Sequence, residues 1–260
     1  MNPTTDSGAT EFLANLSIGT VVIFALIMTI LRIILIQFAV SKAPSTTTPE
    51  PHSFFRGLAE ILESLIIAGI LVFLIIRPFF VQAFFIPSES MEVTLLGHDE
   101  GTNQFTGESQ SDTVHDHIFV NKMIYRLTEP KFRDIIVFRA PLSADSEDLS
   151  KGLPQKENIL IKRLMGVPGD TIEVRDGKLY RNNQVLTEPY IKEPIAQIQR
   201  SEAIYGVGQP LKLGPGQLFV MGDNRNNSND SRFWGTLDRN RVIGKATCIF
   251  WPLKRIRILH

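Results

Sequence analysis

The chain has 260 residues, and its 27 Lys and Arg side chains balance its 27 Asp and Glu side chains. A net charge of zero argues against a strongly basic nucleic-acid-binding face and against an acidic disordered chain. The single cysteine excludes an intramolecular disulfide framework and a multi-cysteine zinc site. Charge is unevenly spread, because residues 1–86 hold nine charged side chains and residues 87–260 hold the other 45. This split indicates a membrane part followed by an ordinary soluble part.

Beyond an N-terminal tail at 1–15, residues 16–40 are nearly all apolar. About 20 apolar residues cross a bilayer core, so this stretch predicts a first transmembrane helix. A cleaved secretory signal is the alternative, but such a signal begins with a basic region. The tail carries only Asp6 and Glu11.

Residues 41–57 are polar and rich in Pro and Thr, and they predict a loop. The apolar residues 58–77 predict a second transmembrane helix, with a buried core helix as the alternative. Lys42 and Arg56 lie in the loop, and the positive-inside rule therefore places it in the cytoplasm. The rest of the chain, 78–260, then lies outside the cytoplasm.

The extracytoplasmic part reads as mainly β, because short apolar segments alternate with turn signals from residue 117 onward. We expect coiled antiparallel sheets or a partly open β-barrel. Turns are expected at 167–170, 176–177 and 182–183. The expected strands cover 117–121, 134–139, 158–166, 171–175, 178–181, 184–186, 217–221, 242–251 and 256–259.

Other stretches of this part are less regular. Residues 97–116 and 141–157 are polar inserts without a convincing strand, and 193–215 is mixed. The apolar run at 79–86 fits either a strand buried on both faces or a surface that dips into the bilayer.

Three polar segments could carry chemistry. The first contains Ser88 and Ser90, which could equally form an ordinary Ser/Pro turn or a helix N-cap. The second contains Lys162 and Arg163 in a strand, where neighbours face opposite sides, so one of them faces the apolar side. A buried lysine has a lowered pKa and can act as a general base, whereas a solvated lysine on an edge strand would be structural.

The third polar segment, 222–235, is dense in turn formers and charges. A flexible loop is the simplest interpretation. Asp230 and Arg232 could instead pair and stiffen it, and Ser228 could orient a neighbouring group by hydrogen bonding.

The histidines offer weaker signals. His115, Asp116 and His117 suggest a metal site, but a third ligand is not evident, and we expect no metal and no cofactor. A Ser-His-Asp triad could recruit His117, but the chain has no G-x-S-x-G nucleophile elbow.

Taken in order, the segments PSESMEVTL, KRLMGVPGD and GDNRNNSNDSRFWG resemble bacterial type I signal peptidase, a Ser/Lys serine protease family. The segments HIFVNKMIYRL and RDIIVFRAP also look like parts of this family. The resemblance covers essentially residues 60–260. Two features depart from the family pattern: Val93 stands where proline is frequent, and the link at 97–116 is longer than usual.

The resemblance implies a role for each matching residue. Ser90 would be the nucleophile and Lys162 the general base, acting through an acyl-enzyme. The Ser88 hydroxyl and the Ser90 N–H would form the oxyanion hole. In this scheme Ser228 would hold the Lys162 amine, and Asp230 and Arg232 would brace that loop.

The resemblance also implies the substrate and the place of work. The substrates would be exported preproteins, cut after a small residue in an Ala-x-Ala-like context. The protein would be a multi-pass protein of the bacterial plasma membrane, with its catalytic domain on the extracytoplasmic side. Its partners would be preproteins, the lipid bilayer and the secretion machinery, and not nucleic acid.

Two other functions compete with this one. A self-cleaving transcriptional repressor also uses a Ser/Lys domain, but it would carry a DNA-binding helical module where this chain has two apolar stretches. An inactive, membrane-anchored β-domain that binds partners is the second alternative. The complete set of expected site residues argues against such decay.

Overall fold

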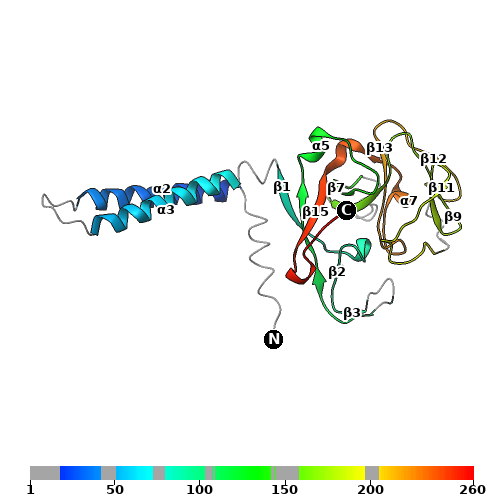
Figure 1. The fold of residues 1–260 in the computed structure, drawn as a ribbon, viewed down its shortest axis with the longest axis horizontal. Helices are drawn as coiled ribbons and strands as arrows, with labels where there is room; N and C mark the ends of the chain where they lie inside the picture. The colour runs from blue at the N-terminus through cyan, green and yellow to red at the C-terminus, as the bar shows by residue number, and fades with distance from the viewer. Residues whose placement is uncertain are drawn as a thin grey trace, which may run out of the picture. The chain divides into compact units, whose positions relative to one another are not determined.

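The computed structural model describes residues 18–41, 51–72, 80–102, 107, 109–141, 144, 158–196 and 205–260. The chain divides into two compact units, Met1–Val81 and Gln82–His260. The first is helical and the second is mainly β (Figure 1), as the charge split near residue 86 predicts.

Helix α2 (Ile18–Ser41) and helix α3 (Pro51–Ile70) pack side by side as a hairpin (Figure 1). Arg32 donates to the Glu63 carboxylate across the two helices at 2.5 Å. α3 begins seven residues earlier than expected, so the loop predicted over 41–57 is wrong in its second half. A proline at the first helical position has no N–H to leave unsatisfied.

Neither helix of the hairpin, nor any other helix in the described part of the chain, has the length and apolarity needed to cross a membrane. The prediction of two spans at 16–40 and 58–77 is therefore not supported. The predicted tail at 1–15 lies outside the described residues.

The second unit is built on an eight-stranded sheet in the order β1-β6-β15-β7-β8-β13-β14, with β16 paired to β15. Its central pairings, from β6 to β14, are antiparallel, which confirms the expected mainly β class. The strands are β1 (Val81–Phe85), β6 (His117–Asn121), β7 (Ile135–Arg139), β8 (Ile159–Gly166), β13 (Gln217–Met221), β14 (Leu237–Asp238), β15 (Val242–Trp251) and β16 (Arg257–Ile258).

The sheet curls because β15 is long and irregular. Its register shifts between Val242 and Gly244, between Ala246 and Cys248, and again near its end. Such bulges bend a strand and increase its twist. One ten-residue strand thereby pairs with β7 at its start and with β6 along the rest, and the sheet takes the form of a half-barrel.

A smaller sheet has the order β11-β10-β9-β12. Its turns match the sequence prediction, because Asp176, Gly177, Asn182 and Asn183 all have positive φ, as type I′ hairpins require. Gly169 has φ +90° in the expected turn before β9. The strands are β9 (Thr171–Arg175), β10 (Lys178–Arg181), β11 (Gln184–Val185) and β12 (Leu211–Lys212).

The segment 97–116 contains strands that the sequence pattern did not predict. β2 (Gly97–His98) pairs with β5 (Val114–His115), and β3 (Gly101–Thr102) pairs with β4 (Ser109–Gln110). Two-residue strands are too short to show an alternating pattern. Most of the other predicted insert, 141–157, lies outside the described residues.

β1 is not buried on both faces, which makes that interpretation of the apolar run at 79–86 wrong. Its side chains alternate in exposure, and Val81 and Phe85 are 37% and 43% exposed. The other interpretation, a surface that dips into the bilayer, stays a prediction.

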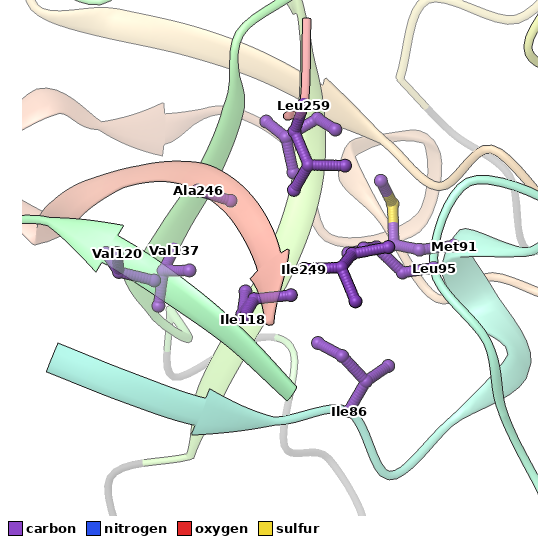
Figure 2. Packing of buried hydrophobic residues seen from close by; sticks show 10 residues of the cluster. Ile86, Met91, Leu95, Ile118, Val120, Val137, Ala246, Ile249 and Leu259 are labelled. Carbon is purple, nitrogen blue, oxygen red and sulfur yellow. The ribbon is translucent and has the colours of Figure 1, made fainter. Parts of the chain in front are cut away.

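A cluster of buried apolar side chains ties the start of this unit to the sheet. Met91 and Leu95, just after β1, are fully buried and pack with Ile118 of β6 and Ile249 of β15 (Figure 2). Burying side chains of this size stabilises each position by about 1.5–3 kcal/mol. These buried side chains therefore fix the segment that carries Ser88 and Ser90 to the half-barrel.

Candidate active site

Ser90 lies in a tight 3-10 turn, η2 (Glu89–Met91), directly after β1. The turn is closed by a hydrogen bond from the Glu92 N–H to the Glu89 carbonyl, at 3.0 Å. Met91 points into the core, so the neighbouring Ser90 side chain is directed away from it. The expected nucleophile thus stands on a short, well-anchored turn.

The loop after β13 covers the other side of this turn. Asn224 N–H donates to the Ser90 carbonyl at 3.2 Å. Gly222 approaches so closely that a Cβ there would collide with the Ser90 carbonyl and with Ser228 Oγ. This close approach explains why a glycine opens the segment GDN at 222–224.

Lys162 reaches Ser90 from β8. Its Nζ lies 2.7 Å from Ser90 Oγ, and the residue is only 3% exposed. Burial lowers the pKa of Lys162 from its usual 10.5 to about 8, although the charges of Asp230 and Asp223 oppose this change. Near neutral pH, a useful fraction of Lys162 is therefore neutral and able to accept a proton from the Ser90 hydroxyl.

Ser88 completes the polar group around Ser90, the expected nucleophile. Its Oγ lies 3.3 Å from Ser90 Oγ, and the residue itself is exposed to solvent. Its backbone is extended, with φ −139° and ψ 154°, which places both hydroxyls on the same side of the turn. A hydroxyl donor this close to the reacting oxygen can also reach an oxygen that forms next to it.

Asp230 and Arg232 form a buried ion pair. The Arg232 Nε donates to Asp230 Oδ1 at 2.8 Å, and the Gly222 N–H donates to Asp230 Oδ2 at 3.0 Å. Burial opposes ionisation of Asp230, but the Arg232 charge outweighs it and holds the Asp230 pKa below its usual range. Arg232 also donates to the Arg225 carbonyl, at 2.7 Å. The pair braces the loop next to Ser90.

Ser228 differs from the sequence expectation. Its Oγ is buried and is close enough to the Asp230 carboxylate to help lower the Asp230 pKa, but it forms no hydrogen bond of good geometry within the part of the chain that the structure describes. The expected bond to the Lys162 amine is therefore not made. The hydroxyl lies against Gly222, on the loop, and Lys162 instead donates to Ser90.

Arg163 is as buried as Lys162, although we expected only one of the two to face an apolar side. Both faces of β8 are covered here, and Arg163 is tolerated because the Asp223 carboxylate accepts two of its hydrogen bonds, at 2.8 and 2.7 Å. Thr94 donates to the same carboxylate at 2.5 Å. These hydrogen bonds to Asp223 join the Ser90 segment, β8 and the loop after β13.

A second buried network was missed by the sequence analysis. Glu92 is 3% exposed and contacts His98 Nδ1 at 2.5 Å and Lys192 Nζ at 3.1 Å. His98 is only six positions from Glu92, but Lys192 is 100 positions away, so no local motif could reveal the whole network. It fastens the segment 97–116 to the residues directly after Ser90.

A cavity of about 380 Å³ opens beside the serines. Ser88, Ser90 and Asn227 line one part of it, and His98 and Asp99 of the segment 97–116 line another. The polar insert of the sequence analysis therefore forms a wall next to the expected nucleophile.

The residues of the sequence H-D-H are held by separate partners. His115 contacts the Ile86 carbonyl at 2.9 Å, and Asp116 accepts two hydrogen bonds from Arg255, at 2.7 and 2.9 Å. His117 packs edge-on against Phe85. Within the described residues, no three His, Cys, Asp or Glu side chains gather where they could hold a metal.

A comparison with known protein families shows which family the chain resembles. The family model described as signal peptidase, peptidase S26, matches residues 58–251. The chain belongs to the signal peptidase family. The matched range contains all the expected site residues: Ser88, Ser90, Lys162, Ser228, Asp230 and Arg232.

Individual signal peptidases are similar over most of their length. A signal peptidase I of Leptolyngbya laminosa is 35% identical over 214 residues, which covers 82% of this chain and 88% of that protein. A signal peptidase I of Mycobacterium tuberculosis is 32% identical, covering 83% of this chain and 79% of that protein. A crystal structure of a signal peptidase I from Enterococcus faecalis is 32% identical and covers 45% of this chain and 97% of that one, with a TM-score of 0.34.

Proposed function

We propose that this protein is a membrane-associated serine endopeptidase that removes signal peptides from exported preproteins, with Ser90 as nucleophile and Lys162 as general base. The observation that carries this proposal is the 2.7 Å contact between Lys162 Nζ and Ser90 Oγ inside a buried site. Family membership supports the same activity.

In the first half of the reaction, neutral Lys162 takes the proton of Ser90 while Ser90 Oγ attacks the scissile carbonyl carbon. The tetrahedral oxyanion is held by the Ser88 hydroxyl and the Ser90 N–H. The C–N bond then breaks, and the leaving amine takes its proton from the Lys162 ammonium. The mature protein departs, and the signal peptide remains as an ester on Ser90.

In the second half, neutral Lys162 takes a proton from water, and the hydroxide attacks the ester carbonyl. The same donors hold the second oxyanion. The C–O bond to Ser90 breaks, and Ser90 recovers its proton from Lys162. The signal peptide leaves with a new carboxyl group, and no residue of the site changes its oxidation or charge state overall.

The sheet offers a place for an extended substrate. β1 is the terminal strand of the described half-barrel, so it has one edge that can pair with a further strand. A peptide can add there through main-chain hydrogen bonds, with alternate side chains facing the protein. β1 leads directly into the turn that carries Ser90, which would bring the scissile bond of such a peptide to the nucleophile. Cleavage after a small residue, in an Ala-x-Ala-like context, is part of this proposal.

The place of work that we propose is the extracytoplasmic face of a bacterial plasma membrane, where the secretion machinery delivers preproteins. The hairpin of α2 and α3 supports membrane attachment, because large side chains such as Ile23, Phe24 and Ile67 are about 60% exposed on it. Attachment by the hairpin does not require two separate spans. Recovery of the protein in the soluble fraction after cell lysis would contradict this part.

The activity is tested by incubating the purified full-length protein with one preprotein and sequencing the new N-terminus. We expect cleavage after a small residue, and we expect Ser90→Ala and Lys162→Ala each to abolish it. Ser111→Ala and Lys178→Ala are the matched controls, since both residues are exposed and lie outside the site. Normal processing by either site variant would refute the assignment, and an inactive wild type that still binds preproteins would favour a binding domain.

A further inference from the structure

The segment 97–116 is attached at both of its ends to the residues around the turn η2. At its start, Gly97 lies so close to the Ser88 backbone that a Cβ on Gly97 would approach it within 2.7 Å. At its end, the Asp116 carbonyl accepts a hydrogen bond from the Ile86 N–H at 2.9 Å. β2 and β5 pair these two ends with each other. The segment is therefore built into the region of the expected nucleophile.

The buried Glu92 network fixes the position of this segment. The Glu92 side chain is 4% exposed and contacts His98 Nδ1 at 2.5 Å, and His98 Nε2 lies 3.7 Å from the Asp112 carboxylate. Lys192 Nζ contacts the other carboxylate oxygen of Glu92 at 3.1 Å. Removing one member of a buried polar network is costly, because the remaining members lose their partners. The segment is thereby held at a fixed distance from the turn that carries the two serines.

The cavity of about 380 Å³ lies between this segment and the turn. Residues 87–90 form one side of it and residues 97–102 the other, and Asn227 also lines it. None of the residues of β1, all of which the structure describes, contributes to the lining. A peptide that pairs with β1 and presents a bond to Ser90 would therefore lie with one half along β1 and the other half in the cavity.

The volume of the cavity indicates which half of the substrate it takes. Cleavage after a small residue requires, on the signal-peptide side, a place that admits a methyl group and excludes larger side chains. At about 380 Å³ the cavity is in the size range of pockets that hold whole small ligands, about 300–1,000 Å³, so it cannot select for a methyl group. It suits a short run of residues with varied side chains. The residues directly after the scissile bond are of that kind.

We propose, on the basis of the peptidase function proposed above, that this cavity binds the first residues of the mature protein and that Glu92 is the positioning residue that holds its outer wall. The cavity would hold the leaving part of the substrate while Ser90 attacks, and would release it once the C–N bond has broken. It would therefore contribute to acylation and take no part when water attacks the ester. The segment 97–116 would set which mature N-termini are processed fastest.

The test uses the full-length protein and two peptides with the same signal-peptide side, one with a single residue after the scissile bond and one with five. For the wild type we expect kcat/KM to be at least about tenfold higher for the longer peptide, the effect of burying one large side chain. Thr102→Trp fills the cavity from its exposed wall, so the ratio of the two kcat/KM values should fall close to one. The matched control is Ser111→Trp, in the same segment but outside the cavity lining, which should keep the wild-type ratio.

The positioning role of Glu92 is tested by the same ratio. Glu92→Ala should lower it by about threefold or more, roughly the effect of one lost hydrogen bond, and Glu92→Gln, which keeps an oxygen for Lys192, should recover part of the loss. A merely structural role would slow cleavage of both peptides together and leave the ratio unchanged, which would overturn this assignment. Circular dichroism establishes that the variants fold.

The remaining outcomes separate this inference from the peptidase assignment. If the wild type cleaves neither peptide, the proposed function fails and the inference fails with it. If the wild type cleaves both peptides equally well, or if Thr102→Trp keeps the wild-type ratio, only the inference is overturned. A third peptide is lengthened on the signal-peptide side instead. If Thr102→Trp removes the advantage of that extension, the cavity holds the signal peptide, and the inference is again overturned.

Discussion

Lys162 and Arg163 are neighbours on β8 and are 3% and 2% exposed, yet their surroundings differ. Arg163 donates two hydrogen bonds to the Asp223 carboxylate, and its guanidinium also lies 4.0 Å from the centre of the Tyr190 ring. Lys162 forms no ion pair within the described chain, and its nearest polar contact is the Ser90 hydroxyl.

The difference shows how one strand can serve both the fold and the chemistry. A buried cation with a close carboxylate keeps its charge and joins the elements around it. A buried cation without one has a lowered pKa, which is what a general base near neutral pH requires. The destabilising side chain is the one that stands next to the proposed nucleophile, as is frequent at functional sites.

The largest expected effect is on activity, and it distinguishes Lys162 from Arg163. Lys162→Met keeps the length of the side chain but has no base, so we expect processing to fall by roughly 10⁴-fold or more. The same variant should be more stable, by on the order of 3 kcal/mol below pH 8, because a pKa lowered from 10.5 to about 8 means that the buried charged form is unfavourable.

The pH dependence of that stability gain provides an internal check. Between pH 8 and pH 10.5 the unfolded chain holds a proton on Lys162 that the folded chain does not, so wild-type stability rises with pH in this window. The advantage of Lys162→Met should therefore shrink as the pH approaches 10.5. Urea unfolding at pH 7 and pH 10 measures it, and a variant that is destabilised at both would contradict the account.

The matching substitution on the other face should affect stability instead. Arg163→Met leaves the fully buried Asp223 without its partner, and we expect a loss of about 3–5 kcal/mol in the free energy of unfolding. Replacing both residues, as in Arg163→Met/Asp223→Leu, should recover a large part of this loss. If the double variant is no more stable than the single one, the pair does not act as a unit.

The next largest effect is expected at the proposed oxyanion hole. Ser88→Ala removes a hydroxyl 3.3 Å from Ser90 Oγ, and loss of one such donor lowers kcat by about 10²–10³-fold. Because Ser88 is solvent-exposed, the free energy of unfolding should stay within about 0.5 kcal/mol of the wild type. Steady-state kinetics on one preprotein peptide tests this, and an unchanged kcat would remove Ser88 from the mechanism.

How much of this could be predicted from sequence depends on how local each signal is. The strands β6, β9, β10, β13 and β15 begin and end where the alternation and turns predict. The polar segments that contain Ser90, Lys162 and Asp230 could be singled out in the same way. Their assembly into one site was expected only from the family resemblance, because no pattern within a single segment relates residues 72 positions apart.

The features that the sequence did not predict have a common physical cause, which is that no local sequence pattern encodes them. The contacts of Glu92 with Lys192 and of Arg163 with Asp223 join residues 100 and 60 positions apart, so only the folded chain brings them together. The two-residue strands of the segment 97–116 give no periodic signal. Ser228 was assigned a partner by analogy, and a hydroxyl position of this kind depends on loop details that sequence patterns do not encode.

The pH profile of activity tests the lowered pKa of Lys162, and its expected effect is smaller than those above. With a Lys162 pKa of about 8, kcat/KM should rise about tenfold per pH unit below that value and level off above it. The profile is measured with a peptide substrate that lacks ionisable groups near the cleavage site. Activity that is undiminished at pH 6 would exclude a lysine base with this pKa.

The smallest effect is expected from Ser228→Ala. The buried Ser228 hydroxyl forms no hydrogen bond of good geometry among the described residues and only helps to lower the Asp230 pKa, so removing it should change the free energy of unfolding by less than about 1 kcal/mol. Because Lys162 Nζ contacts Ser90 and not Ser228, kcat should fall less than about threefold, and the midpoint of the pH profile should not move. A tenfold loss accompanied by a shifted midpoint would mean that Ser228 contacts Lys162 during the reaction. The environment of the base would then be completed only when substrate is bound, and the low pKa of Lys162 would depend on the loop after β13 as well as on burial.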